Sequence, residues 1–106
     1  MPKYLAHASY TVEGLKGLLK DGGTKRREAV GQLVKGVGGT VEAFYYAFGD
    51  DDLFVIFDLP DNVSATAISL IVNASGAAKV KVTVLLTPEE MDQATKKTVD
   101  YSPPGQ

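Results

Sequence analysis

The chain contains an unbroken apolar run at Leu53-Phe54-Val55-Ile56-Phe57. Successive side chains of a β-strand point to opposite faces of its sheet, so this run predicts a central strand that is apolar on both faces. A short polar segment, Gly49-Asp50-Asp51-Asp52, separates it from a second β-rich stretch at residues 40–48. This spacing predicts a hairpin in which residues 40–48 and 53–59 pair as antiparallel strands.

Helices are predicted on both sides of this hairpin in the sequence. Residues 25–38 and 62–75 carry apolar side chains at helical spacing, and both segments end at glycine. Thr24 and Asp61 precede them as expected N-caps, because a short polar side chain there accepts a hydrogen bond from the first turn. A shorter helical pattern over residues 15–20 is interrupted by two glycines before the first helix begins.

Two further strands are predicted at residues 4–12 and 79–86, the second with apolar residues alternating with Lys and Thr. The element order is then βαββαβ, which predicts an α+β fold of ferredoxin-like topology. In that fold a four-stranded antiparallel sheet has its first and third strands in the centre and its helices on one face.

The end of the chain shows a separate helix signal. Thr87-Pro88-Glu89-Glu90 has the spacing of a capping box with Pro at the first helical position, which predicts a helix to about Lys97. We therefore expect a single domain over residues 1–98 and a loose tail over residues 99–106, where little apolar surface anchors the chain.

The apolar faces predict self-association. Phe54 and Phe57 point to opposite faces of the third strand, and in the second strand Val41, Ala43 and Tyr45 are expected opposite Phe44 and its neighbours. Helices cover one face of the sheet only, so something else must cover the other. We expect a second copy of the chain there, which gives a homodimer or a multiple of it.

Composition excludes several classes of function. The 106 residues include no cysteine and one histidine, which removes thiolate chemistry and metal sites that need more than one imidazole, and we expect no metal and no cofactor. Thirteen acidic against eleven basic residues argue against a nucleic-acid or anionic-membrane surface. No apolar run approaches the ~20 residues of a membrane span or forms a secretory signal, so we expect a cytoplasmic protein.

Three residues are candidates for a site. His7 lies on a central strand, where it is either a general acid or base in a groove or, as we favour, a hydrogen-bonded interior histidine. Tyr45 offers a phenol to a ligand, or packs with its hydroxyl in water. Asp58 is expected to be a half-buried carboxylate near His7, or to lie at the solvated end of its strand.

Two charged segments favour plain structural roles. Asp50-Asp51-Asp52 contains potential oxygen ligands, but consecutive residues in a tight turn rarely aim at one point, so turn formation is the preferred interpretation. Lys25-Arg26-Arg27 opposes the helix dipole at a helix start. It could contact an anion, although a solvated helix end is favoured.

The stretch from Phe44 to Leu53 resembles the signature of the GYD-domain family, a Gly-x-Tyr-Asp hairpin after the second strand. Asp58-Leu59-Pro60-Asp61 is similar to the family's acidic-x-Pro-Asp run, and the resemblance extends over residues 4–96. Asp51 stands where the motif has Tyr. The resemblance implies a ferredoxin-like fold of the dimeric α/β-barrel kind and leaves the chemistry open.

Two functions follow as expectations. The first is a small homo-oligomeric module that binds a small apolar or aromatic ligand or serves as an interaction domain. The second is a cofactor-independent enzyme, of oxygenase or isomerase type, that uses a groove near the sheet, by analogy with other barrels of this architecture. His7 beside a pocket with Tyr or Asp neighbours favours the enzyme, and His7 packed under a helix favours the module.

Overall fold

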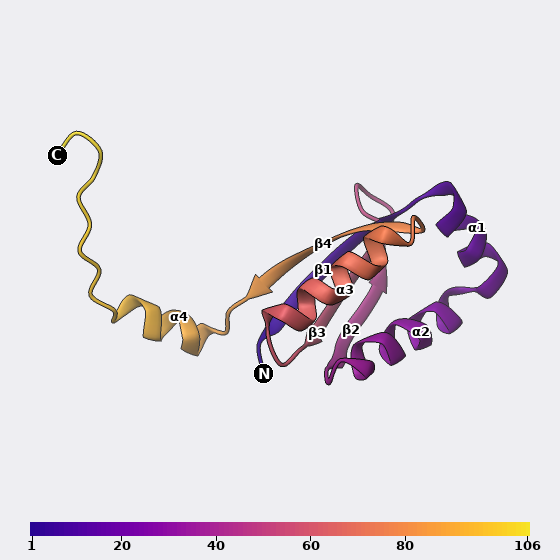
Figure 1. Ribbon diagram of the computed structural model, residues 1–106, viewed down its shortest axis with the longest axis horizontal. Coiled ribbons are helices and arrows are strands. Elements are labelled where there is room, and N and C mark those ends of the chain that lie inside the picture. The colour runs from indigo at the N-terminus through magenta and orange to yellow at the C-terminus, as the bar shows by residue number, and fades with distance from the viewer.

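The computed structural model describes residues 1–106 and contains four strands and four helices (Figure 1). In chain order these are β1 (Lys3–Tyr10), α1 (Val12–Asp21), α2 (Gly23–Gly36), β2 (Thr40–Tyr46), β3 (Leu53–Asp58), α3 (Asn62–Ala74), β4 (Ala78–Leu85) and α4 (Pro88–Thr95). The strands form one antiparallel sheet in the order β2-β3-β1-β4. The α+β architecture is consistent with a ferredoxin-like fold.

The core lies between one face of the sheet and the helices α2 and α3. Alternate residues of the two central strands point into it, which are Tyr4, Ala6 and Ala8 of β1 and Leu53, Val55 and Phe57 of β3. They pack against Val34 of α2 and Ile68 of α3. The hydroxyl of Tyr4 donates to Asn62 Oδ1 at 2.6 Å, so the buried phenol has a partner, and burial raises the pKa of Tyr4.

The predicted helix over residues 62–75 is confirmed. It begins where Asp61 accepts a hydrogen bond from the Ser64 N–H at 2.8 Å. This bond favours the ionised carboxylate and lowers the pKa of Asp61. The capping box at Thr87 and Glu90 is also confirmed.

The segment before β2 contains the two helical stretches that the sequence predicts, with earlier starts and a different cap for the second. The two helices meet at Gly22. The φ of 82° at Gly22 is a backbone conformation that residues with a side chain rarely adopt, and it lets the chain change direction. Gly22 is therefore the N-cap of α2, and Thr24 lies inside the first turn instead of capping it. The first strand ends at Tyr10 because Thr11 caps α1, with its side chain accepting from the Gly14 N–H.

A β-bulge in β2 changes one predicted orientation. Val41 pairs with Phe57 and Ala43 pairs with Ile56, so Glu42 is the extra residue between them. Val41 consequently packs on the helix side, and the expectation that it shares a face with Ala43 and Tyr45 was wrong. Past the bulge, Ala43 and Tyr45 lie on the face away from the helices.

The C-terminal part of the chain leaves the body of the molecule. In Figure 1, α4 and the residues after it extend beyond the end of β4, away from the sheet and the other helices. Every residue of α4 is exposed, and the longest dimension of the chain is 57 Å. None of the helices has the length and apolar character that crossing a membrane would demand.

Substitution of two glycines tests the packing around α2 and the start of β2, with a crowded site at Gly39 and an open site at Gly31. A Cβ on Gly39 would lie 2.3 Å from the carbonyl oxygen of Asp58, so Gly39→Ala should lower the free energy of unfolding by about 1–3 kcal/mol. Gly31 lies within α2 with open space around its Cα, so Gly31→Ala should raise it by about 0.5–1 kcal/mol. Urea unfolding measures both, and a shift of the same sign in the two variants would contradict this packing.

Candidate functional site

One face of the sheet is covered by no other element of the chain, and we call it the open face. The strand register places residues of all four strands on this face, away from the core. These are Lys3, Leu5, His7 and Ser9 of β1, Phe54, Ile56 and Asp58 of β3, Ala43 and Tyr45 of β2, and Lys79, Lys81 and Thr83 of β4. The side chains of Tyr45 and Phe54 are exposed although they are aromatic.

His7 lies in the central row of this face. The strand register places Tyr45 opposite Phe54, Phe54 opposite His7, and His7 opposite Lys81. The rings of His7 and Phe54 stack with centroids 6.4 Å apart. His7 is therefore neither packed under a helix nor isolated in solvent, and its ring covers part of an otherwise exposed aromatic face.

The imidazole of His7 has a carboxylate partner. Its Nδ1 lies 3.2 Å from Oδ2 of Asp51, and the Ser9 hydroxyl donates to the other oxygen of Asp51 at 3.3 Å. Asp51 thus joins two side chains of β1 to the hairpin that follows β2. Sequence reasoning missed this pair, although the signal was available in Asp51 itself, an acidic residue at the motif position where the family pattern has Tyr.

The hairpin loop is held against the end of β1 by the other contacts of its acidic residues. Asp52 Oδ2 accepts from the Tyr10 N–H at 2.8 Å, and the Asp52 N–H donates to the Ala8 carbonyl at 2.8 Å. These bonds fix the loop over the open face and so position Asp51 beside His7. Asp51 and Asp52 contact different residues of β1, so their carboxylates do not point to one centre.

Of the two alternatives for Asp58, the structure favours the solvated end of the strand, because Asp58 is the last residue of β3 and does not lie near His7. The register pairs Asp58 with Lys3, and Lys3 Nζ lies 3.0 Å from Asp58 Oδ1 while also contacting Glu42. These carboxylates raise the pKa of Lys3. Lys3 and His7 are four residues apart on one strand, so about 13 Å separates Asp58 from the imidazole.

Tyr45 shares a row with His7 but lies two strands away, because Phe54 stands between them. Its side chain is 71% exposed, which leaves the phenol free to meet a partner. The structure therefore brings His7, Asp51 and Tyr45 to one part of the open face and leaves Asp58 at the other end. Asp51 on Nδ1 leaves Nε2 of His7 available for a hydrogen bond or a proton.

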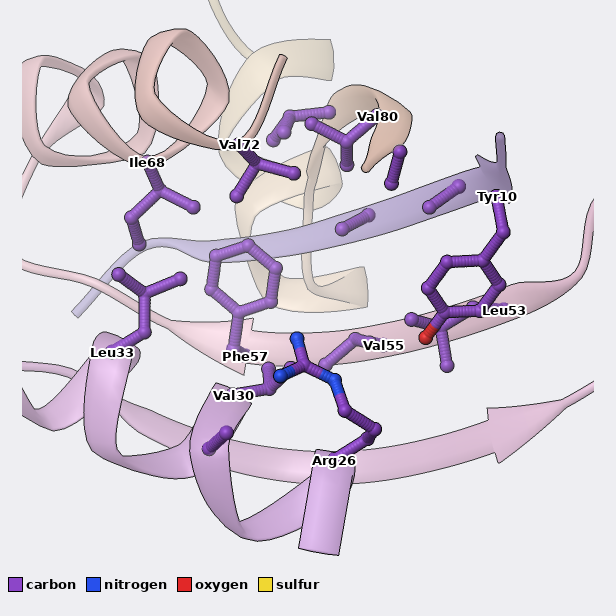
Figure 2. Close-up of a pocket in the computed structure, with 15 residues that line it drawn as sticks. Tyr10, Arg26, Val30, Leu33, Leu53, Val55, Phe57, Ile68, Val72 and Val80 are labelled. Atoms are coloured by element: carbon purple, nitrogen blue, oxygen red, sulfur yellow. The ribbon is translucent and has the colours of Figure 1, made fainter. Parts of the chain in front are cut away.

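An apolar cavity of about 120 Å³ lies on the opposite side of the sheet, between the sheet and the helices α2 and α3 (Figure 2). Fourteen of its fifteen lining residues are hydrophobic, and the remaining one is Arg26. None of His7, Tyr45 and Asp58 lines it. Sequence reasoning missed this cavity, and the available signal was a set of small residues on core-facing positions, namely Ala6, Ala8 and Ala78.

The role of Asp51 can be tested by alanine substitution. Asp51→Ala removes the partner of His7 and Ser9 and should lower the free energy of unfolding by about 1 kcal/mol. Asp50→Ala is the matched control, because the carboxylate of Asp50 contacts no other side chain, and its effect should stay within about 0.5 kcal/mol. Equal losses in urea unfolding would show that Asp51 does not anchor the loop.

Comparison with known proteins supports the resemblance seen in the sequence. The model of the GYD domain matches residues 4–95, a segment that includes every strand and helix of the fold except the first residue of β1. A search of the curated proteins finds no match. Because the matched segment covers nearly the whole chain, this protein belongs to the GYD domain family.

Proposed function

We propose that this protein is a homo-oligomeric binding and interaction module in which two copies pack through their open faces. The observation that supports this proposal is the exposed Phe54, which lies with the half-buried Leu5 and Ile56 on the two central strands of a face that no other element of the chain covers. The exposed Tyr45 on the edge strand β2 extends this patch. Contiguous apolar patches of this kind are unusual on monomers and mark sites of association.

The distribution of charge on the open face also favours an interface. Charged side chains lie at its margins, with Lys79 and Lys81 on the edge strand β4 and the Lys3–Asp58 pair at one end. The apolar residues occupy the middle. An apolar centre with a charged rim is the common anatomy of interfaces between proteins.

The C-terminal arm, residues 86–106, would extend this interface. Four strands of this length give the open face a footprint of about 500 Å², whereas a stable association buries about 800 Å² on each partner. In the arm, Leu86 and Met91 are more than half exposed and face no other element of the chain. We infer that the arm packs on the partner copy and supplies the remaining apolar contact.

Packing of two open faces would also enclose the row that contains His7. His7, Asp51 and Tyr45 would then be polar groups in a mostly apolar groove, which is the usual composition of a site for a small apolar or aromatic ligand. We favour binding in this groove over catalysis because Phe54 stacks on the imidazole and His7 lines none of the main pockets of a single chain. The contact of Asp51 with Nδ1 leaves Nε2 free, an arrangement that a general base would also use, so a cofactor-independent enzyme is the alternative.

A charge placed on the open face should separate the copies. We expect the wild type to sediment with twice the mass of one chain at micromolar concentration. Phe54→Glu should give a folded monomer, because a carboxylate at the centre of an apolar interface would lose its hydration. Val63→Glu is the matched control, since Val63 is 78% exposed on α3 and lies outside the open face. It should remain a dimer.

The opposite face gives the second control. Phe57 is 2% exposed and points toward the helices, so Phe57→Glu should unfold the chain and not merely dissociate it. Sedimentation velocity and circular dichroism distinguish the two results. A wild type that is monomeric at micromolar concentration, or a Val63→Glu variant that dissociates as readily as Phe54→Glu, would overturn the proposal.

A further inference from the structure

We propose that the cavity between the sheet and the helices α2 and α3 is a second binding site, specific for a small carboxylate with an apolar tail about one aromatic ring in size. The proposal does not depend on the assembly of two copies, because the cavity lies on the face of the sheet opposite the open face. Three features of the cavity support the proposal, namely its apolar walls, its size and the single charge at its mouth.

The walls are apolar on three sides. Figure 2 shows Val30 and Leu33 on α2, Ile68 and Val72 on α3, and Phe57 of the sheet between the two helices in this view. The volume of about 120 Å³ is similar to the roughly 150 Å³ of an apolar cavity that binds benzene. A single aromatic ring or a short hydrocarbon chain therefore fits, and it would restore dispersion contacts that the empty walls lack.

Small side chains create this space. Ala6, Ala8 and Ala78 are core-facing strand residues that line the cavity, and Ala29 lines it from α2. Their neighbours on the same strand faces, such as Tyr4 and Val82, are larger. The four alanines leave a gap in the core that a ligand can occupy. Such a gap is unusual, since protein interiors are normally close-packed.

The mouth of the cavity carries one positive charge. Arg26 is half-buried and is the one charged residue of the lining, and its guanidinium forms no ion pair within the chain. Figure 2 shows that the guanidinium of Arg26 and the hydroxyl of Tyr10 both extend toward the cavity. A guanidinium binds a carboxylate through two parallel hydrogen bonds, and one positive charge balances one carboxylate.

The neighbouring basic residues do not share this position. Lys25 is paired with Asp21 at 3.6 Å, and Arg27 lines a separate hollow beside Phe44 and Tyr46. The two arginines are consecutive on α2 and differ in the surface they meet. Arg27 is therefore a matched control for Arg26, with the same charge and nearly the same place in the sequence.

The test compares two probes that share a phenylpropyl skeleton and differ in the end group, which is a charged carboxylate in one and a neutral hydroxyl in the other. Titration calorimetry of the full chain with 3-phenylpropionate and with its neutral analogue 3-phenyl-1-propanol should show tighter binding of the acid, by about tenfold. Arg26→Gln should remove this preference and bind the acid as weakly as the alcohol. Arg27→Gln should bind both probes as the wild type does. Equal binding of acid and alcohol by the wild type, or an equal loss in Arg27→Gln, would overturn the assignment of Arg26.

Two further measurements locate the site. Ala29→Phe should abolish binding of both probes while the circular dichroism spectrum is unchanged, because Ala29 is an exposed residue at the cavity wall. In the wild type, 3-phenylpropionate should shift the methyl resonances of Val55, Ile68 and Val72. Shifts confined to Ile56 and Leu5 would move the ligand to the open face and overturn the proposal.

The Phe54→Glu variant shows whether ligand binding in the cavity depends on assembly of two copies. This variant should bind 3-phenylpropionate with the affinity of the wild type, whether or not the wild type is a dimer. Loss of binding in Phe54→Glu, with a folded chain, would show that the site needs the partner copy and would overturn an independent cavity site.

Discussion

The architecture depends on one constraint, which is that the sheet has two apolar faces and the chain has helices for one of them. In β3, Leu53, Val55 and Phe57 are buried beneath α2 and α3, while Phe54 and Ile56 point the other way. Burying one such side chain stabilises a fold by about 1.5–3 kcal/mol, and the residues of the open face gain little of this in a single chain. A second surface is the straightforward means of gaining it, and in the proposed assembly a second copy of the chain supplies that surface.

The hairpin between β2 and β3 connects this constraint to the candidate site. Its backbone and side-chain bonds to β1 hold Asp51 over the open face, where the carboxylate meets His7 and Ser9. Asp51 contacts His7 and Ser9 through separate carboxylate oxygens, whereas a tyrosine has one neutral oxygen, so Asp51 changes the polar chemistry beside His7. Membership of the GYD domain family does not decide what the surfaces of this chain bind, because binding depends on particular residues such as Asp51.

Much of the fold could be predicted because its signals are local. Asp61 and Thr87 begin their helices through bonds within one turn, and the alternation of β4 shows directly in its residues. The errors arose where a local pattern depends on distant partners. The bulge at Glu42 places Val41 on the helix side of the sheet. The strand register places Asp58 beside Lys3, and the carboxylate that contacts His7 is that of Asp51. The small core-facing residues Ala6, Ala8 and Ala78 indicated thin packing, but the size of the cavity could not be predicted because it depends on how two helices pack over the sheet.

The central claim is that the open face is buried against a second copy. Isotope-filtered nuclear Overhauser measurements on a mixture of ¹³C-labelled and unlabelled chains detect contacts between copies directly. The account predicts intermolecular contacts from the ring of Phe54 and the methyl groups of Ile56 and Leu5. Intermolecular contacts that involve only the outer surface of α3, or none at all at millimolar concentration, would contradict it.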